Sequence, residues 1–541
     1  AIVLIAQGNG CPILRKECAY IEQLRREFEP KGVAFFMINA NIHEDRQSII
    51  DEARAFGIHM PILEDRTQTV SASLKISRIA QAVVIDPKQW SVVYNGAVND
   101  QYGYETRQQE IKNHYVREAL EAVLSKRPVV QHQSMPKGCL INFESKQQNA
   151  GPGYAADIAP ILTKSCVTCH STGGIAPWSM DRYETIKGRG AMIKEVLELK
   201  RMPPWGADPH FRPLQEGTEL DADHQRLILQ WIKNGMPRGE GNDPLLDVHK
   251  PSIEWPLGPP DLILSLEQAQ HIPATGLVEY RYVRAKEIME EDRWVKAIYW
   301  KPGNRKIVHH AIMYALNNSK LEHPDWFYRS GLYVKEEGEA ITIENDMIHL
   351  FDTWVPGQQP FLVPAETGLY LPKGTTFAFQ LHYTTTGKEE SDDTQVGVYF
   401  YKEQPPHILS LKFSYNHNVL IPPREKDYRI SSDYLFNKDA VLYAIRPHMH
   451  TRGRRVTYTL IYPNGQSEMI LSVPRYRFLW QFRYIFKEPV KLPAGTRIVA
   501  QAAFDNSAQN PDNPNPDQWV SYGMLTENEM LGSMYYTSES P

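Results

Sequence analysis

Cysteine is scarce in this chain of 541 residues, and none follows residue 169. The five cysteines are Cys11, Cys18, Cys139, Cys166 and Cys169. Everything after Cys169 must therefore fold without disulfide bonds, so packing and hydrogen bonding alone stabilise it. This excludes a disulfide-stapled scaffold, the usual solution of small secreted domains, for the larger part of the chain.

The sequence also has no apolar run of about 20 residues, the length that a transmembrane helix needs, so we expect no membrane span. A formal net charge of -5 gives no basic footprint for nucleic acid. No initiator methionine is present, because the chain begins inside the apolar run AIVLIAQ, which predicts a core strand rather than a signal peptide. We expect that the true N-terminus, with any signal sequence, is missing.

The composition is that of a soluble globular protein, with 42% hydrophobic and 23% charged residues, and the length predicts a multidomain chain. Residues 1–126 alternate strand and helix patterns, which predicts an α/β sheet. This segment resembles the thioredoxin-like redoxin family in NGCPILRKEC, GVAFFMINAN and VVIDP…VVYNGAVND. The resemblance implies that Cys11 lies at a helix N-terminus, where main-chain N–H groups lower a thiol pKa.

Two departures from the redoxin pattern bear on activity. Cys18 lies seven residues after Cys11. That is about 10 Å along a helix, too long for a disulfide unless Cys11 lies off the helix. Ala80 stands where the family usually has a cis-proline. Cys11 and Cys18 are therefore candidate redox thiols, but we favour a redox-inactive scaffold. Cys139 lies in the Pro- and Gly-rich linker 127–154, where it can pair with a redoxin cysteine or stay free.

Residues 155–240 are predicted to be helical and contain CVTCH, Cys166–His170. C-x-x-C-H is the attachment signature of c-type haem, in which Cys166 and Cys169 bind the haem covalently and His170 is an axial ligand. A zinc site would need a second cysteine pair, which the chain lacks. The segment resembles a small class I cytochrome c, and DHQRLILQWIKNG fits its last helix. Met202 in LKRMPPW is the expected sixth ligand. The alternatives are Met180, Met192 and His210.

A second linker, 241–275, is rich in proline, and the chain after it consists of short strand patterns separated by turn signals. This pattern predicts two all-β sandwich domains with a jelly-roll-like arrangement. We place them at 276–405 and 406–541, because KEQPP marks a break between them.

Four stretches of this β half carry side chains that bind metals. IRPHMHTRGRR places Arg446, His448 and His450 on one face of a strand end. His309 and His310 are adjacent, so one ion can take both only at a bulge or strand end, or through different ring nitrogens. The remaining two are His382, which shares the polar face of FAFQLHYTT with Gln380, and Met530. Imidazole together with thioether favours copper, because zinc rarely binds thioether.

In this order the four sites resemble the copper type II ascorbate-dependent monooxygenases, the peptidylglycine and dopamine hydroxylases, over about residues 255–541. The resemblance implies an electron-transfer copper on His309, His310 and His382, and an oxygen-activating copper on His448, His450 and Met530. It also implies substrate-pocket positions for Arg446 and Gln380. Gly532 and Met534 stand where the peptidylglycine branch has an Asn and a Tyr for its substrate's carboxylate, so we do not expect a peptidylglycine substrate.

These observations predict a copper-dependent monooxygenase that hydroxylates a C–H bond of a small organic substrate with O2. The fused c-type haem would deliver the electrons and would receive them from an external donor. Two copper ions and one haem are the expected cofactors. The loop DNSAQNPDNPNPD either binds calcium through its oxygens or is only rich in turns.

Covalent haem and copper together favour an exported location, a bacterial periplasm. Two alternative functions stay open at this point. One is a non-catalytic electron carrier with copper and haem. The other is a thiol–disulfide or peroxide redoxin with accessory electron-transfer domains.

Overall fold

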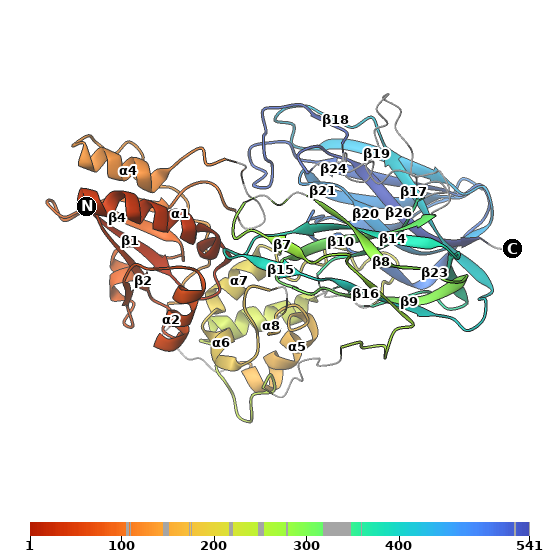
Figure 1. Ribbon diagram of the computed structural model, residues 1–541, viewed down its shortest axis with the longest axis horizontal. Coiled ribbons are helices and arrows are strands. Elements are labelled where there is room, and N and C mark those ends of the chain that lie inside the picture. Colours follow the sequence, from red (N-terminus) through yellow and green to blue (C-terminus); the bar gives the residue numbers. More distant parts are fainter. Residues whose placement is uncertain are drawn as a thin grey trace.

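The computed structural model shows an α/β domain at one end of the molecule, a large β half at the other, and helical segments between them (Figure 1). The described residues are 1–103, 108, 110–143, 151–172, 174, 176–215, 220–246, 254–276, 278, 280–317, 348–356, 358, 360–523 and 526–539. No helix within these residues is long and apolar enough to cross a membrane.

The N-terminal domain is built on a five-stranded sheet with the order β3-β2-β1-β4-β5. Strands β1, β2 and β3 are parallel, whereas β4 and β5 are antiparallel to their neighbours. The central strand β1, IVLIAQ, is almost fully buried because its side chains are nearly all apolar. The elements are β1 (Ile2–Gln7), α1 (Pro12–Phe28), the 3-10 helix η1 (Glu29–Lys31), β2 (Ala34–Asn39), α2 (Arg46–Ala55), β3 (Ile62–Glu64), α3 (Thr69–Ser73), β4 (Gln81–Asp86), β5 (Ser91–Ala97) and α4 (Tyr115–Leu124). The predicted α/β sheet is confirmed.

The helical segments lie between this domain and the β half (Figure 1). They are the π-helix η2 (Tyr154–Ile158), α5 (Ala159–Ser165), α6 (Tyr183–Lys187), α7 (Gly190–Glu198) and α8 (Ala222–Lys233). Helix α8 forms where a last helix was expected, since Asp221 caps it and its apolar face buries Ile228 and Trp231. Most of these helices are short and long irregular stretches join them, so the part that the structure describes does not establish an all-α cytochrome c fold.

The first half of the β region is a sandwich of the sheet β11-β10-β14-β8 and the strands β13-β9-β16-β6. Apolar side chains from both sheets share one core. The elements are β6 (Leu262–Ser265), β7 (Gln270–Ile272), β8 (Arg281–Ile288), β9 (Arg293–Lys301), β10 (Val308–Asn317), β11 (Ile348–Trp354), β12 (Phe361–Leu362), β13 (Thr367–Leu371), β14 (Thr375–Tyr383), β15 (Glu390–Asp392) and β16 (Gln395–Phe400). Strand β12 pairs with β9, and β15 pairs with β7.

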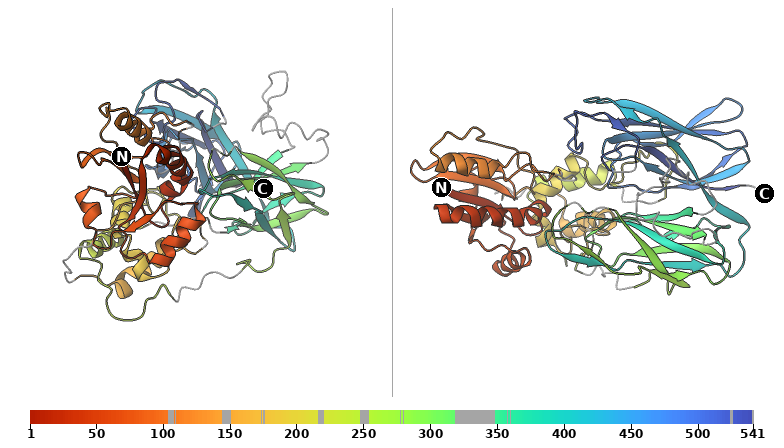
Figure 2. Two further views of the ribbon diagram at one scale, coloured as in Figure 1. Left: turned by 60° about the vertical axis from the view of Figure 1, so that its left-hand side comes forward. Right: turned by 45° about the horizontal axis from the view of Figure 1, so that its top comes forward.

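The second half is a sandwich of the strands β23-β20-β26-β17 and the sheet β19-β24-β21-β22, again around one core. The elements are β17 (His407–Asn416), β18 (Leu420–Ile421), β19 (Tyr428–Leu435), β20 (Ala440–His448), β21 (Gly453–Ile461), β22 (Ser467–Val473), β23 (Tyr484–Leu492), β24 (Arg497–Phe504), β25 (Val520–Ser521) and β26 (Leu531–Glu539). Figure 2 shows the two sandwiches as neighbouring lobes of the β half.

One sheet crosses the boundary between the two sandwiches. Strand β13 of the first pairs in parallel with β17 of the second, through Thr367 with His407 and Gly368 with Ile408. One layer of each sandwich therefore belongs to a single nine-stranded sheet, while the other two layers are separate four-stranded sheets. The boundary placed at 405/406 falls in the turn between β16 and β17, but the two lobes share main-chain hydrogen bonds and are not separate sheets.

The segment after Met202 packs on the second sandwich rather than on the helices. The Trp205 ring lies 5.6 Å from Phe482 and 5.1 Å from Tyr484, between ring centroids. The Tyr484 hydroxyl donates to the Trp205 carbonyl at 2.7 Å, and Arg212 forms an ion pair with Glu468 at 2.7 Å. This loop attaches the helical segments to the β half.

Candidate metal centre

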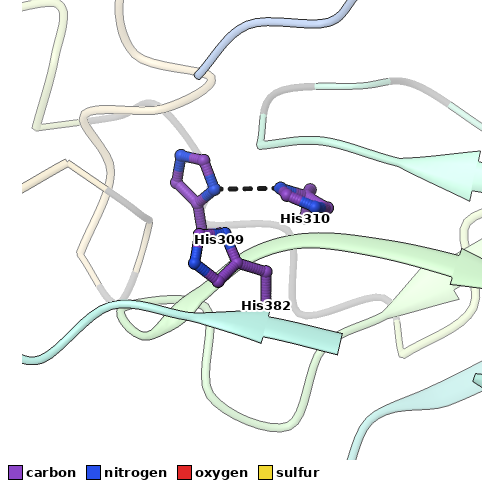
Figure 3. A group of neighbouring side chains, drawn as sticks. All are labelled: His309, His310 and His382. Atoms are coloured by element: carbon purple, nitrogen blue, oxygen red, sulfur yellow. Dashed lines mark hydrogen bonds between the residues drawn. The ribbon is translucent and has the colours of Figure 1, made fainter. Parts of the chain in front are cut away.

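Three histidines from two neighbouring strands meet at one end of the first sandwich (Figure 3). His310 on β10 is paired directly with His382 on β14. The register between these strands shifts between Val308 and His310, so a β-bulge brings His309 to the same side. Nitrogen atoms of His309, His310 and His382 all lie within 4.8 Å of one another. Among the described residues, this is the one group of three or more His, Cys, Asp or Glu close enough to hold a metal ion.

The three imidazoles are neutral and short of hydrogen-bond partners. Burial lowers the pKa of His309 and His310 well below the usual value, and it lowers the pKa of His382 to about 4. His309 Nδ1 lies 3.0 Å from His310 Nδ1 (Figure 3). His309 Nε2 and His382 Nδ1 are buried without a partner. A buried polar atom left unpaired costs about 1–3 kcal/mol, so this donor set fits a bound metal ion, which would satisfy both atoms.

Aromatic and amide groups surround this group. The Tyr280 ring lies 4.8 Å from His382 and 5.8 Å from His310, between centroids. Gln380, two residues before His382 on β14, donates from Nε2 to the Tyr282 hydroxyl at 2.6 Å. The polar face of β14 therefore carries the hydrogen-bonded Gln380 and also His382, while the opposite face of β14 packs in the core.

A second pair of imidazoles lies at the end of β20 in the second sandwich. The rings of His448 and His450 are 5.2 Å apart and nearly perpendicular. His448 Nδ1 lies 2.6 Å from Gln481 Oε1, and His450 Nδ1 lies 3.1 Å from the Asn528 carbonyl. Oxygen acceptors at both Nδ1 atoms place the protons there, so the lone pair of each ring is on Nε2, as in metal-binding histidines. Burial lowers the pKa of His448, which keeps that ring neutral.

Met530 is buried and directly precedes β26, the strand that pairs with β20. The carboxylate of Glu529 accepts main-chain N–H groups from His450 at 2.9 Å, Arg452 at 2.6 Å and Met530 at 3.3 Å. Burial raises the pKa of Glu529 to about 7, although these hydrogen bonds oppose the shift. One side chain thus fixes the two segments that carry the second set of candidate ligands.

Phe478 connects the two sets of histidines. Its ring centroid lies 6.5 Å from His309, 6.3 Å from His310 and 5.6 Å from His450. The ring comes from the loop between β22 and β23 and is buried. The Tyr280 hydroxyl adds a second link, because it lies 3.5 Å from Thr526 Oγ1 in the segment that leads to Met530. Sequence reasoning missed both residues, since no motif marks an aromatic side chain that bridges two domains.

Arg446, two residues before His448, lies between the two sandwiches. Its Nη2 donates to the Thr353 carbonyl at 3.2 Å and to Gln358 Oε1 at 2.9 Å, both in the first sandwich. Its Nε is buried without a partner. The positive charge of Arg446 contributes to the lowered pKa of both His310 and His448, so the guanidinium is near both sets of histidines.

Gly532 and Met534, the two positions that depart from the peptidylglycine pattern, both lie in tightly packed surroundings. A Cβ on Gly532 would lie 2.8 Å from the Tyr415 ring, so Tyr415 takes the space of a larger residue there. Met534 is buried and packs in the core of the first sandwich.

The candidate calcium loop, 505–517, is tied by its own hydrogen bonds. Asp505 and Asp512 each lie 3.7 Å from Arg454, and Asp517 lies 2.7 Å from Arg424. The side-chain amides of Asn506 and Asn510 donate hydrogen bonds to main-chain carbonyls. These contacts give a turn-rich loop whose carboxylates face cations of the protein, which does not favour calcium binding.

The CVTCH motif follows α5 directly, and the His170 ring is fixed by contacts with Trp178. His170 Nδ1 lies 3.0 Å from the Trp178 carbonyl, and the two rings are 4.8 Å apart. Burial lowers the pKa of His170 to about 4, so the ring is neutral and its lone pair is on Nε2. Cys166, Cys169 and His170 therefore fit the donor set of a covalently attached haem.

The candidates for the sixth ligand lie in different places. The Met180 main-chain N–H donates to the His170 carbonyl at 2.7 Å, and Met192 shares a cavity with Trp178. Met202 opens the loop that packs on the second sandwich, and His210 is exposed in that loop, 2.6 Å from Asp208. Met180 is thus joined to His170 through the main chain, and Met202 stays the predicted sixth ligand with Met180, Met192 and His210 as alternatives.

The redoxin cysteines lie where the resemblance places them. Cys11 caps the N-terminus of α1, and Ala80 has a left-handed backbone with φ 62° at the expected proline position. Cys18 is buried two turns into α1, and burial together with Glu52 raises its pKa far above the usual value. None of the five cysteines forms a disulfide in the structure. Cys18 is therefore poorly suited to be a reactive thiol.

Two solved structures are similar to about a quarter of the chain each. An uncharacterized conserved protein from Geobacillus kaustophilus is 26% identical over 27% of this chain and 78% of its own, with a TM-score of 0.25. A hypothetical protein from Sinorhizobium meliloti is 21% identical over 26% of this chain and 77% of its own, with a TM-score of 0.23. Scores this low carry no argument about fold or function. No curated protein sequence matches the chain.

Two family models match parts of the chain. Residues 1–100 match the AhpC/TSA family, and residues 406–539 match the copper type II ascorbate-dependent monooxygenase, C-terminal domain. The second match includes His448, His450 and Met530. The chain therefore carries an AhpC/TSA redoxin domain at one end and a copper type II ascorbate-dependent monooxygenase C-terminal domain at the other.

Proposed function

We propose that this chain is a copper-dependent monooxygenase that hydroxylates a C–H bond of a small organic substrate with O2. One observation carries the proposal. The buried His309, His310 and His382 group, with two donor atoms lacking partners, lies one phenyl ring away from His450 in a domain that matches the monooxygenase family. Two sets of soft or borderline ligands at this separation suit a pair of copper ions.

His309, His310 and His382 would hold one copper, and His448, His450 and Met530 would hold the other. Copper at these positions would supply the one-electron steps by which O2 is reduced and a C–H bond is oxidised. The protein's own groups prepare the sites. Gln481 and the Asn528 carbonyl fix the ring orientation of the second pair, as outer-shell acceptors do for ligating histidines.

Phe478 and Tyr280 pack against the histidine rings. Arg446 offers a buried Nε without a partner near both sets, and we assign this donor to a carbonyl or carboxylate oxygen of the substrate. Gln380 is tied to Tyr282, so its role is to position that ring beside the first set. Tyr415 occupies the space that a side chain at position 532 would need.

The electrons would come through the helical segments. A haem held by Cys166, Cys169 and His170 would supply reversible one-electron chemistry, and an external donor would reduce it. Covalent haem and copper in one chain support an exported location, and we place the protein in a bacterial periplasm.

The test uses the purified full-length chain loaded with copper. Elemental analysis should find two copper ions per chain, and a pyridine haemochrome spectrum should show a c-type haem. With ascorbate as the reductant and a panel of small substrates that carry activated C–H bonds, 18O2 should place one labelled oxygen atom in the product.

The paired variant His448→Ala/His450→Ala is the control for free copper. It should keep the first copper and incorporate no label. A fully loaded chain that accepts electrons from ascorbate but labels no substrate across the panel would reject the hydroxylase and support the electron carrier.

A further inference from the structure

The linker after the redoxin domain lies across the end of that domain that carries Cys11. Main-chain hydrogen bonds join the Ile79 N–H to the Cys139 carbonyl at 2.8 Å and the Ile141 N–H to the Ser77 carbonyl at 2.9 Å. The strand-like pairing continues through a bridge between residues 78 and 140. This pairing places Cys139 against the chain just before Ala80, beside the core that contains Cys11.

Gly138 makes the close approach possible. A Cβ at this position would lie 1.7 Å from the Ile79 carbonyl oxygen, so a larger residue would push the linker away. Arg78 Nη1 donates to the Gly138 carbonyl at 3.0 Å, and Arg78 Nη2 forms an ion pair with Glu195 Oε1 of α7 at 2.5 Å. The helical segments thus help to hold Cys139 in place.

The two thiols contact each other directly. Hydrogen bonds reach the Cys11 sulfur from the side chain and the main chain of Cys139, and from the main chain at Leu14 and Ile13 in the first turn of α1. Burial opposes ionisation of Cys11, but these hydrogen bonds outweigh it and lower the pKa of Cys11 to about 7. The hydrogen bond to Cys11 and burial raise the pKa of Cys139, so Cys11 is the thiolate of the pair.

Cys11 is buried, whereas Cys139 is partly exposed and lines a cavity between the redoxin domain and the helical segments. Gly10, Trp178 and Arg189 form other parts of its wall. Because Cys139 is partly exposed and Cys11 is buried, a reagent in solution reaches Cys139 before Cys11.

We propose that Cys11 and Cys139 form a redox-active dithiol that exchanges with low-molecular-weight disulfides. Cys139 passes its proton to the hydrogen-bonded Cys11 thiolate and attacks one sulfur of the incoming disulfide. The first thiolate that is released takes this proton from Cys11, which becomes a thiolate again. The Cys11 thiolate then attacks Cys139 Sγ, which forms the Cys11–Cys139 bond and releases the second thiolate. The two released thiolates take up the two protons that the cysteines have given up, so two cysteine thiols are oxidised and one external disulfide is reduced. The site is independent of the copper function proposed above.

The experiment treats the full-length protein, reduced and freed of reductant, with glutathione disulfide, and then blocks free thiols and maps peptides by mass spectrometry. Wild type should form the Cys11–Cys139 disulfide. Cys11→Ser should stop with one glutathione on Cys139, and Cys139→Ser should form no disulfide at Cys11. Cys18→Ser is the matched control and should behave as wild type.

Gly138→Ala keeps both cysteines and tests the geometry. It should accumulate the glutathione adduct on Cys139, with closure slowed at least roughly tenfold, because displacement of the linker misaligns the two sulfurs. Three results would overturn the proposal. The first is a Cys11–Cys18 disulfide in wild type, and the second is a wild-type chain that does not form the Cys11–Cys139 bond at any ratio of glutathione disulfide to glutathione. The third is formation of this bond in Gly138→Ala at the wild-type rate.

Discussion

A buried ion pair between Asp352 and Arg483 joins the two sandwiches, and its removal should cost more than any surface charge change. Arg483 Nη1 lies 2.9 Å from Asp352 Oδ1, and the two side chains are 3% and 0% exposed. The other carboxylate oxygen accepts from Trp300 Nε1 at 2.9 Å. The Arg483 guanidinium lies 3.6 Å from the centre of the Phe361 ring. Asp352→Asn keeps the shape and removes the charge.

The expected loss follows from the burial. Loss of one partner leaves the Arg483 charge uncompensated, which costs about 3–5 kcal/mol in a buried pair. Arg446 is buried nearby, and Asp352 also stabilises its charge. Since a domain is stable by about 5–15 kcal/mol, this is a large share of the total. At about 2–4 °C per kcal/mol, the melting temperature of the β half should fall by about 6–20 °C.

Asp517→Asn is the matched control, because Asp517 pairs with Arg424 at 2.7 Å on the surface, where the side chains are 62% and 77% exposed. This variant should lose about 0–1 kcal/mol. Scanning calorimetry of the full-length chain, with urea unfolding of the same samples, compares the two. Equal shifts in both variants would refute the reasoning, because burial would then not decide the cost.

Three further predictions concern the metal centres. Met530→Ile should keep the copper on the three-histidine group but stop hydroxylation, as measured by copper per chain and 18O incorporation; turnover at the wild-type rate would contradict the assignment of the oxygen site. His310→Ala should leave one copper per chain and block reoxidation of the reduced haem by O2, which rapid-mixing absorbance follows; unchanged reoxidation would contradict the electron path. In copper-free protein, stability should fall as the pH drops from about 6.5, the pKa of an unfolded histidine, toward about 4, the pKa of folded His382, because only the unfolded state takes up the proton. Denaturant midpoints measure this loss, and midpoints that do not change over this range would contradict a neutral buried imidazole.

The sequence by itself determined the local features of this protein. The alternation of strand and helix patterns predicted the sheet of the first domain, and the short strand patterns predicted the β half. Adjacent His309 and His310 required a bulge or a strand end, and the register shift beside His310 supplies it. The resemblance of NGCPILRKEC to the redoxin family implied that Cys11 lies at a helix N-terminus, and Cys11 is the N-cap of α1. These features depend on neighbours within a few residues, so side-chain periodicity and turn chemistry suffice to predict them.

Only the tertiary structure decided which distant segments meet. Phe478 lies between two sets of histidines, Arg446 turns toward the first sandwich, and Cys139 rather than Cys18 contacts Cys11. The parallel pairing of β13 with β17 likewise joins two lobes that the sequence presents as separate. Each of these contacts closes a long loop of chain. Its existence depends on the packing of whole domains and leaves no period or motif in the residues that make it.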